Sequence, residues 1–500
     1  MQSSPAAAAA TAGPRRTRAA MVGAMLAMAL AALDQTIVAP ALAPIAAELG
    51  DFQLVGWIVS AYLLTSTCAA PLIGKLSDLY GRRLALSACL AVFTASSALC
   101  ALAPSMIWLI LARAVQGLGG GGLMALAEVV LADTFSPREQ GRSAPYIAGV
   151  WAVASVIGPL LGGVLTEYCG WAAIFWINLP LGGLALLITE RALRGLPVAG
   201  KRAPLDIASV ALLCGATVAL LLVLSLGGKT LGWGAPELLA LISVALVLGG
   251  GFVRRQARSA APILPRRFMG DRVIRPILAG TFVVYGCYLT MVVLSPLYFQ
   301  VALGRPVTET GLLLSPLVFS TCVSATLAGR YTRRVGRCKR PMLVGLPAAI
   351  VALALLAAFA RTVPAELVSA GLFVIGFGLG PIFPCGMVAA QNAAERRDLG
   401  AVLGALSFAR ALGGSVAIAA TSALVLGLAA AALPETGTGA GLEDLARQTL
   451  TPQARAAVAG AFGVAFGALA GALCVGLALY GLVEDRALSG WTPAAAAPGG

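Results

Sequence analysis

The sequence contains no histidine, and only 11% of its 500 residues are charged, against about 25% in a typical soluble protein. None of its ten cysteines forms a C-x-x-C pair, so a metal site of the usual Cys/His kind is not expected. The phosphate-binding pattern G-x-x-x-x-G-K-[ST] is missing too, which argues against ATP as an energy source. No nucleophile–base set is recognisable, so we expect neither an enzyme nor a cofactor.

What the sequence has in abundance is apolar residues, at 59% of the chain with a mean hydropathy of +0.90. A chain this apolar cannot cover a water-facing surface, so its solvent must be mostly lipid. A formal net charge of +14 could suggest a nucleic-acid partner. The basic residues instead lie in short runs between apolar stretches, a distribution that fits the orientation of a membrane protein.

A helix needs about 20 apolar residues to cross the hydrocarbon core. By this measure the sequence predicts fourteen membrane-spanning helices. Their expected ranges are 20–42, 54–74, 84–103, 106–131, 143–166, 171–190, 206–226, 236–253, 276–302, 309–328, 341–360, 366–389, 403–427 and 457–483. The first range is longer than the apolar region of a signal peptide, so we expect it to be retained.

The distribution of Lys and Arg predicts the orientation. With a cytoplasmic N-terminus, 28 of the 35 basic residues fall in inside segments and five in outside segments. This bias predicts that both termini are cytoplasmic. We therefore expect a multi-pass protein of the cytoplasmic (inner) membrane.

Two related halves are predicted by an internal repeat. Gly74, Gly81, Arg82, Arg142, Gly149 and Gly158 recur 255 residues later as Gly329, Gly336, Arg337, Arg397, Gly404 and Gly413. The expected fold is an all-α membrane protein of two six-helix bundles with an inserted two-helix hairpin. The expected divisions are a tail at 1–19, a bundle at 20–190, the insert at 191–275, a bundle at 276–483 and a tail at 484–500.

An acidic residue, Asp34, lies inside the first predicted helix, where an unpaired charge costs a few kcal/mol. Desolvation brings its protonation within reach of neutral pH, as a proton-coupling site requires. Arg113 lies at a similar depth in the fourth helix, roughly 10–12 Å below the outer boundary, so the two could meet. The alternatives are an acid with a purely structural partner and an arginine that bonds backbone carbonyls.

A second acid, Glu128, lies fifteen residues after Arg113, near the cytoplasmic end of the same helix. It could be a second proton station or an acid of the inner vestibule. It could equally reach the interface by snorkelling and have no role. Arg410 is the other cation within a predicted helix, and its role is not defined by the sequence.

The cytoplasmic loop between the second and third helices has the sequence GKLSDLYGRR. Its glycines allow a tight turn and close packing, while its acid can face a helix N-terminus or a basic group. Such contacts could hold an inner gate closed, although positive loops also stay inside for reasons of topology alone. The candidate gating residues are Gly74, Lys75, Asp78, Gly81, Arg82 and Arg83.

The fifth helix contains GPLLGG, which predicts a hinge or a tight helix–helix seam, with simple packing as the alternative. The candidate residues are Gly158, Pro159, Gly162 and Gly163. Other polar or aromatic residues within or near helices could line a substrate cavity. These candidates are Tyr62, Gln116, Trp151, Asn178, Gln300, Gln391 and Asn392.

Several segments together resemble the major facilitator superfamily, and in particular its fourteen-helix drug:proton antiporters. They are LDQTIVAPALAPI with Asp34, GKLSDLYGRR, LILARAVQGLGGGG with Arg113, GPLLGG, FWINLP, PLYFQ and FARALGGS. The resemblance covers roughly 20–483. The chain departs from the family pattern in the second-half loop, where Arg333 occupies the position of Asp78, and in the additional acid Glu128.

The resemblance implies export of hydrophobic, often cationic compounds in exchange for protons, with Asp34 and Arg113 carrying the coupling. Asp78 and its basic neighbours would regulate opening. The expected partners are a small-molecule substrate, protons and the lipid bilayer, with the protein acting as a monomer. A passive lipid or metabolite facilitator of the same fold is the alternative, and a membrane sensor without transport is a third.

Overall fold

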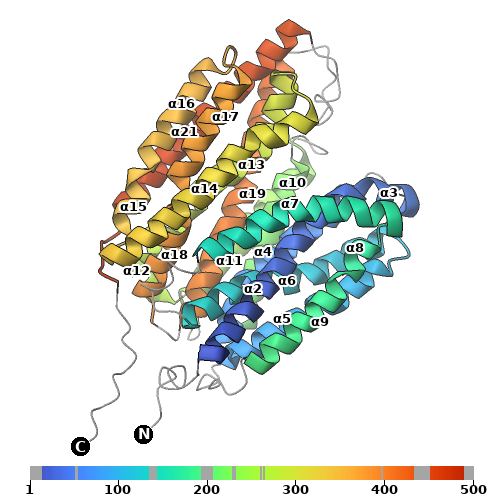
Figure 1. Ribbon diagram of the computed structural model, residues 1–500, viewed down its shortest axis with the longest axis vertical. Helices are drawn as coiled ribbons and strands as arrows, with labels where there is room; N and C mark the ends of the chain where they lie inside the picture. The colour runs from blue at the N-terminus through green and yellow to red at the C-terminus, as the bar shows by residue number, and fades with distance from the viewer. Residues whose placement is uncertain are drawn as a thin grey trace, which may run out of the picture.

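The computed structural model describes residues 14–50, 54–134, 144–192, 206–227, 232, 234–259, 262, 265–395, 398–432 and 451–488. This part of the chain is built from helices and contains no β-strand. The helices form two bodies that lie side by side and diverge from each other toward one end (Figure 1). We call these bodies the N-half and the C-half.

The N-half contains the first nine helical elements of the described chain. They are α2 (Pro14–Ile37), η1 (Ala39–Ala41), α3 (Leu42–Leu49), α4 (Val55–Tyr80), α5 (Arg82–Ala101), α6 (Met106–Thr134), α7 (Ala144–Cys169), α8 (Ala173–Trp176) and, as its last helix, α9 (Asn178–Ala192). Helix α6 packs against α2, α4 and α5, which makes it the centre of this half.

The C-half begins after a short helix, α12 (Arg266–Gly270). Its elements are α13 (Ile274–Leu297), η4 (Tyr298–Ala302), α14 (Val307–Val335), α15 (Lys339–Val344), α16 (Leu346–Phe359), α17 (Ala365–Leu379), α18 (Ile382–Ala393), α19 (Leu399–Ala432) and α21 (Pro452–Gly481). The apolar core of this half also includes Val129 and Ala132, which belong to α6 of the N-half.

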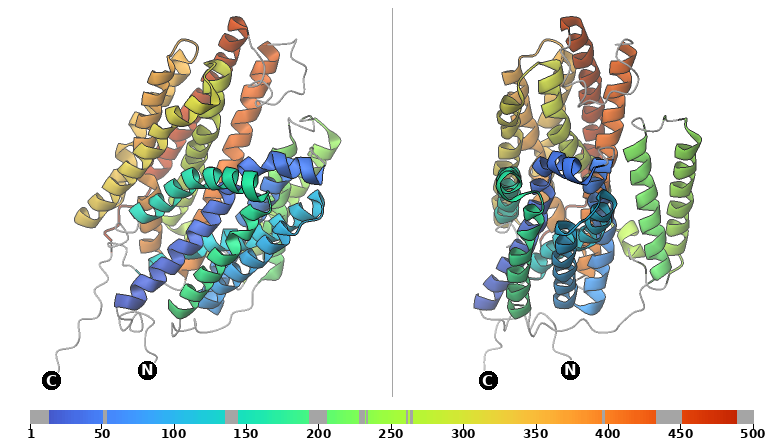
Figure 2. Two further views of the ribbon diagram at one scale, coloured as in Figure 1. Left: turned by 45° about the vertical axis from the view of Figure 1, so that its right-hand side comes forward. Right: turned by 90° about the vertical axis from the view of Figure 1, so that its right-hand side faces the viewer.

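A hairpin of two helices, α10 (Ile207–Leu226) and α11 (Pro236–Gln256), lies to one side of both bodies (Figure 2). Helix α10 packs on α11 and also on α4 and α19, one helix from each half. Its N-terminus is capped by Asp206, whose carboxylate accepts hydrogen bonds from the backbone and hydroxyl of Ser209.

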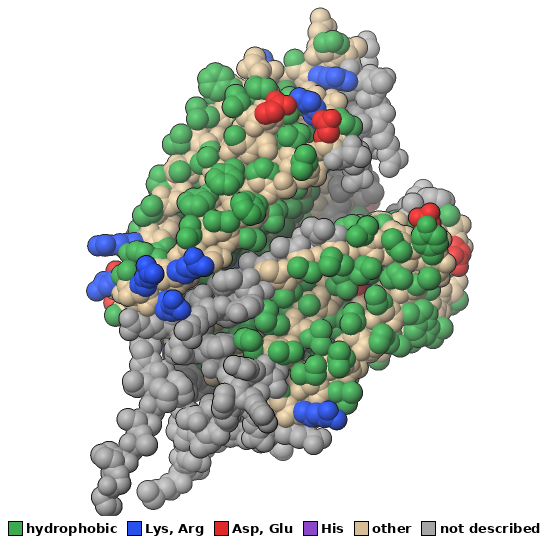
Figure 3. Space-filling view, in the orientation of Figure 1, with side chains coloured by type: hydrophobic (Ala, Val, Ile, Leu, Met, Phe, Trp, Pro, Cys, Tyr) green, Lys and Arg blue, Asp and Glu red, His purple; other side chains and the backbone are tan. Residues whose placement is uncertain are grey.

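Twelve helices of the described chain are long and apolar enough to cross a membrane. The 20-residue α10 adds a shorter apolar stretch, and α7 has 26 residues. Hydrophobic side chains cover the visible flanks of both halves, and Lys and Arg gather near the end where α12 and α15 lie (Figure 3). The chain is therefore a multi-span membrane protein, and the count of fourteen stays a prediction.

In both halves a glycine with a positive φ angle ends a helix, and the two glycines are 255 residues apart, as in the sequence repeat. Gly81 ends α4 with φ 93°, and Gly336 ends α14 with φ 71°. Both values lie in the region that favours glycine, because a Cβ atom there is strained. The repeat partners Arg142 and Arg397 and the tail residues 1–13 and 489–500 lie outside the described residues.

Candidate functional site

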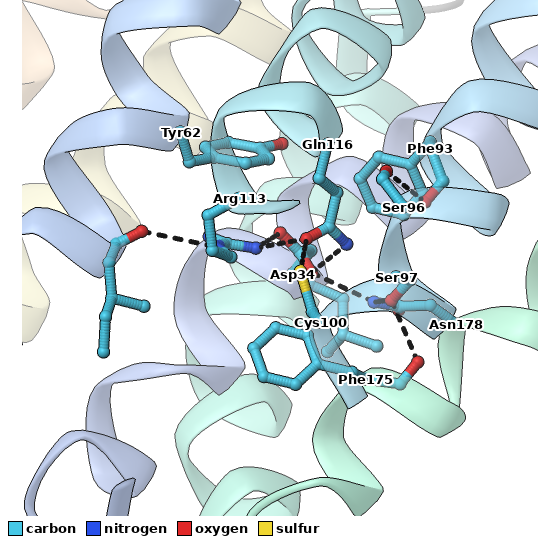
Figure 4. A network of polar contacts seen from close by, with 12 residues as sticks. Asp34, Tyr62, Phe93, Ser96, Ser97, Cys100, Arg113, Gln116, Phe175 and Asn178 are labelled. Carbon is cyan, nitrogen blue, oxygen red and sulfur yellow. Dashed lines mark hydrogen bonds and ion pairs between the residues drawn. The ribbon is translucent and has the colours of Figure 1, made fainter. Parts of the chain in front are cut away.

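Asp34 of α2 and Arg113 of α6 form an ion pair inside the N-half, with 2.6 Å between Oδ2 and Nη1 (Figure 4). Their side chains are 0% and 1% exposed. The contact expected from the depths of these two residues is thus confirmed. A buried pair of this kind holds only if further polar groups satisfy the remaining lone pairs and protons.

Two amide side chains supply those groups. Gln116 and Asn178 each donate a hydrogen bond of 3.0 Å to Oδ1 of Asp34. The Oε1 atom of Gln116 accepts from Nη1 of Arg113 at 2.8 Å, and Asn178 also donates to Ser97 at 3.0 Å. The carboxylate oxygens of Asp34 accept all three of these contacts. The network joins α2, α5, α6 and α9.

Aromatic rings enclose the guanidinium of Arg113. Its Cζ atom lies 4.3 Å from the ring centre of Tyr62 and 5.8 Å from that of Phe175, and its Nε donates to the carbonyl of Ile58 at 3.3 Å. Cation–π contacts of this type strengthen when water is excluded. Tyr62, Gln116 and Asn178, predicted as cavity residues, therefore belong to the surroundings of the Asp34–Arg113 pair.

The glycine-rich segment of α6 lets its neighbours approach closely enough to build this network. A Cβ atom at Gly117 or Gly121 would run into the backbone of α4. A Cβ atom at Gly119 would lie 2.8 Å from the backbone nitrogen of Phe93 on α5. Small residues of this kind allow helix backbones to pack in contact. They bring Arg113 and Gln116 within reach of three other helices.

The predicted gating loop lies where the two halves meet. Asp78, near the end of α4, accepts hydrogen bonds from the backbone nitrogens of Gly400 at 3.0 Å and Ala401 at 2.9 Å, at the start of α19. The N-terminus of a helix carries partial positive charge, so it attracts a carboxylate. Arg82 adds a contact of 2.5 Å to Asp78 and one of 2.9 Å to Asp133.

Glycines on both sides of this seam make the contact possible. A Cβ atom at Gly74 of α4 would run into the carbonyl oxygen of Gly400, and one at Gly400 would run into that of Gly74. Gly404 packs in the same way on the backbone at Ala70 and Pro71. Any larger side chain would separate α4 from α19 at this point.

The remaining residues of the loop have more local roles. Arg83 pairs with Glu190 of α9, which also accepts a hydrogen bond from Ser87, so these contacts stay within the N-half. Lys75 is half-buried on α4. Gly81 provides the turn into α5.

The GPLLGG segment lies on α7 and packs against α2. A Cβ atom at Gly158 would run into the hydroxyl of Thr36, and one at Gly162 into the carbonyl oxygen of Ile37. Gly163 has open space around it, and Pro159 lies within the helix. The segment therefore forms a tight helix–helix seam directly beside Asp34. A seam of this kind was one of the interpretations of GPLLGG, next to a hinge and simple packing.

An ion pair that the sequence did not predict connects the halves. Nη2 of Arg410 on α19 lies 2.6 Å from both carboxylate oxygens of Glu128 on α6 and 3.0 Å from the hydroxyl of Ser407. The sequence analysis identified Glu128 and Arg410 separately, as an acid and a base within predicted helices. Their pairing depends on how the halves are placed against each other, which the sequence does not show.

The other residues predicted to line a substrate cavity do not lie together in one place. Gln300 lies in η4, and Asn392 donates to the carbonyl of Ala487 at 3.1 Å. Gln391 is buried, and neither polar atom of its side chain has a hydrogen-bond partner among the described residues. The side chain of Trp151 lies outside the described residues. A small cavity, with room for about one water molecule, lies instead in the C-half, lined by Thr281, Tyr285, Ile382, Phe383, Met387, Leu406 and Arg410.

Comparisons with known sequences agree with this architecture. Residues 24–418 match the Major Facilitator Superfamily. "Multidrug transporter protein MdtP" of Bacillus subtilis (strain 168) is 32% identical over 408 residues, which are 81% of this chain and 74% of that protein. "Efflux pump dotC" of Dothistroma septosporum is 34% identical over 412 residues, which are 81% of this chain and 70% of that protein.

Solved structures show the same fold. A bacterial homologue of the iron transporter ferroportin in an outward-facing state aligns with a TM-score of 0.62 at 14% identity, over 93% of this chain and 98% of that chain. The proton:xylose symporter XylE aligns with a TM-score of 0.62 at 14% identity, over 95% of this chain and 98% of that chain. From its sequence match and its fold, the chain belongs to the Major Facilitator Superfamily of membrane transporters.

Proposed function

We propose that this protein exports hydrophobic drugs or secondary metabolites across the cytoplasmic membrane in exchange for protons. The observation that carries the proposal is the enclosed pair of Asp34 and Arg113, in a chain similar to proteins named as a multidrug transporter and an efflux pump. An ionisable group held inside a membrane helix is a functional-site hypothesis by default.

The network supplies a physical means of coupling. A proton on Asp34 would remove the negative charge that Arg113, Gln116 and Asn178 all contact. Arginine does not lose its own proton, so its guanidinium would be left as a buried cation without a counter-ion. The two protonation states of Asp34 therefore favour different arrangements of α2, α6 and α9. A proton gradient can drive transport if these arrangements open to opposite sides.

The seam between α4 and α19 fits a gate on the cytoplasmic side. Asp78 holds the start of α19 there, while the helices of the two halves diverge away from this end (Figure 2). This arrangement supports an outward-facing form, with the substrate leaving as Asp34 takes up a proton. Opening toward the cytoplasm would require the Asp78 contacts to break.

The proposal includes fourteen spans, with α7 and α10 added to the twelve described above. The α10–α11 hairpin then stands between two six-helix bundles at 20–190 and 276–483, and an even number of spans keeps both termini cytoplasmic. The assignment to the fourteen-helix drug:proton antiporters rests on this count and on the sequence resemblance.

Purified protein in proteoliposomes with an imposed pH gradient tests the proposal. The probes are hydrophobic dyes that include charged and uncharged members. We expect uphill dye movement with the wild-type chain and none with Asp34→Asn, while the exposed Glu366→Gln variant on the outer surface behaves as wild type. Dye movement that ignores the pH gradient would instead support a passive facilitator.

A further inference from the structure

The connection between α14 and α15 carries a concentration of positive charge. The segment from Arg330 to Arg340 has six basic residues and no acidic one. It includes the end of α14, the turn at Gly336 and the start of α15. Figure 3 shows basic side chains gathered over this end of the C-half.

Three of these side chains, Arg330, Arg334 and Arg340, are exposed and have no hydrogen-bond or ion-pair partner in the described part of the chain. Arg337 and Lys339 belong to the same segment but contact the end of α21 and the residues after it, at 2.7 Å and 2.8 Å. The segment therefore has one set of charges that binds the protein and another that does not. We call Arg330, Arg334 and Arg340 the unpaired arginines.

Helical spacing places two of the unpaired arginines at the end of an apolar stripe on α14. Leu312, Phe319 and Leu327 of this helix are 76%, 64% and 47% exposed. At about 100° per residue, these three side chains and those of Arg330 and Arg334 lie within about 80° of one another around the helix axis. Apolar side chains that remain exposed on a membrane-spanning helix face lipid. The two arginines therefore continue the lipid-facing side of α14.

The third unpaired arginine has similar surroundings. Arg340 and Val344 are four residues apart on α15 and share a face, and Val344 is 77% exposed. The next helix, α16, continues outward with Val351 and Leu355, which are 56% and 53% exposed. Exposed apolar side chains thus begin directly beyond Arg340 as well.

The length of α14 indicates the depth of these side chains in a bilayer. Glu309, in the first turn of the helix, lies near Arg305 at the opposite end of the C-half. Arg330 comes 21 residues later, or about 32 Å at 1.5 Å per residue, which matches a hydrocarbon core of about 30 Å. Arg334 lies one further turn along, about 6 Å, which is also roughly the thickness of the headgroup layer. Both arginines therefore reach the level of lipid headgroups.

Membrane topology alone does not account for the unpaired arginines. The related loop of the N-half, GKLSDLYGRR, also carries positive charge, but its two arginines pair with acids of the N-half. At the positions 255 residues before Arg334 and Arg340, the N-half has Leu79 and Ala85. A loop that only sets orientation thus needs no arginine on these faces.

We propose that Arg330, Arg334 and Arg340 bind the phosphate of an anionic phospholipid, whose acyl chains lie along the apolar stripe of α14. A guanidinium can bind phosphate through two parallel hydrogen bonds, and three neighbouring positive charges favour a headgroup with a net negative charge. A soluble partner does not fit this face, because the stripe that the arginines continue lies within the bilayer. The inference goes beyond the proposed function and depends on it only for the leaflet, which is the cytoplasmic one in the proposed orientation.

Native mass spectrometry of the full chain tests the proposal. The protein is released from micelles with equal amounts of phosphatidylglycerol, which is anionic, and phosphatidylethanolamine, which has no net charge. We expect the wild type to retain phosphatidylglycerol preferentially. The triple variant Arg330→Gln/Arg334→Gln/Arg340→Gln should lower the ratio of the two bound lipids at least fivefold, since one basic residue near an anionic surface contributes roughly that factor. A wild type without preference, or a triple variant that keeps it, would overturn the proposal.

Three arginines at the opposite end of the C-half provide the matched control. Arg305 pairs with Glu366, while Arg361 and Arg455 lie against glycine backbones, so all three contact the protein. Their joint replacement by glutamine changes the net charge equally and should leave the lipid ratio as in wild type. An equal fall in both triple variants would show that the preference follows net charge and not position, which contradicts the assignment.

Thermal unfolding in detergent provides a second measurement and identifies the ligand. Phosphatidylglycerol should raise the unfolding midpoint of the wild type more than that of the triple variant at residues 330, 334 and 340, because it binds the folded chain. Glycerol 3-phosphate has the same phosphate without acyl chains, so it should not raise the midpoint at the same concentration. If it stabilises the wild type as much as the lipid does, the arginines bind a soluble phosphate and the lipid assignment is wrong.

The lipid site and the proposed function can fail separately. Lipid retention is measured without a pH gradient and without a transported dye. If the wild type retains phosphatidylglycerol as expected but its dye movement ignores the pH gradient, the proposed function fails and the lipid site stands. Proton-driven dye movement in a chain without lipid preference would give the opposite result.

Discussion

Thr36 of α2 donates a hydrogen bond of 2.8 Å to the carbonyl oxygen of Ala154 on α7. Thr36 lies two residues after Asp34, and Gly158, one turn after Ala154, leaves room for the threonine side chain. The position of the buried acid therefore depends on how closely α7 packs on α2. The GPLLGG segment therefore acts on the Asp34–Arg113 network through this contact.

Gly158→Ala is expected to impair both packing and transport. Its methyl group would displace the Thr36 hydroxyl or push α7 outward, a change that typically costs about 1–3 kcal/mol. Thermal unfolding in detergent should show a lower midpoint, and proton-driven dye efflux should fall. Gly163→Ala in the same segment has open space and is the control. Equal effects of the two substitutions would contradict this account.

Asp78→Asn is expected to favour the form that opens to the cytoplasm. It removes a negative charge from the N-terminus of α19, an interaction that contributes about 1 kcal/mol and hence roughly a fivefold change in population. Spin labels at Leu84 and Val335, in a background without the native cysteines, report the distance between the cytoplasmic ends of α5 and α14. That distance should increase.

The control for this measurement is Glu190→Gln. It removes the contact with Arg83, which stays within the N-half, so the label distance should not change. A larger separation in this variant, or none in Asp78→Asn, would show that the contact between α4 and α19 does not hold the halves together.

Asn178→Leu should weaken proton-driven transport. The variant loses the 3.0 Å hydrogen bond that Asn178 donates to Asp34, and a hydrogen bond to a charged group contributes about 1.5 kcal/mol. The initial rate of dye efflux from proteoliposomes with an imposed pH gradient should fall by roughly tenfold. Ser96→Ala is the control, since its hydroxyl bonds only to its own helix. Unchanged efflux in Asn178→Leu would contradict the role of this hydrogen bond.

Asp271, which precedes α13 outside the membrane-spanning segments, should stabilise the protein at neutral pH but not in acid. Partial burial raises the pKa of this carboxyl, but hydrogen bonds from the backbone of Ile274 and Val273 and the contact with Arg486 more than offset that effect and lower it. A lowered pKa in the folded state means that the stabilisation is complete above the unfolded value, about 3.9, and is lost as the pH falls below it.

Asp271→Ala should therefore lower the unfolding midpoint at pH 7, with a loss of about 1 kcal/mol, as for a helix cap. The difference from wild type should shrink as the pH falls from 5 to 3. Thermal unfolding in detergent across this range measures it. A difference that stays constant with pH would show that the charge of Asp271 plays no part.

The contact between Asp34 and Arg113 could be predicted because depth in the membrane follows from position along a helix. The roles of Gln116 and Asn178 could not. Their depth is equally clear, but the sequence does not give the rotation of each helix, which turns both amides toward Asp34. The pairing of Glu128 with Arg410 could not be predicted either, because it also depends on how the two halves are placed against each other.

The sequence analysis also did not predict where a membrane-spanning helix is interrupted. The sequence predicts one helix at 366–389, whereas the structure has α17 and α18, separated at Gly380 and Pro381. Proline has no backbone N–H to donate, so the ladder of hydrogen bonds is interrupted there. Hydropathy detects the length of an apolar stretch and is insensitive to such an interruption. It therefore predicts spans better than it predicts their shape.

The mutual contact of Gly74 and Gly400 suggests a way to hold the protein in the form that opens where α4 and α19 meet. A single methyl group at either position would act as a wedge between the backbones of α4 and α19. An alanine at one of these glycines should therefore trap the chain open to the cytoplasm without touching the charged residues. Such a trapped protein would be a suitable antigen for selecting antibody fragments that recognise this shape and keep the protein in it.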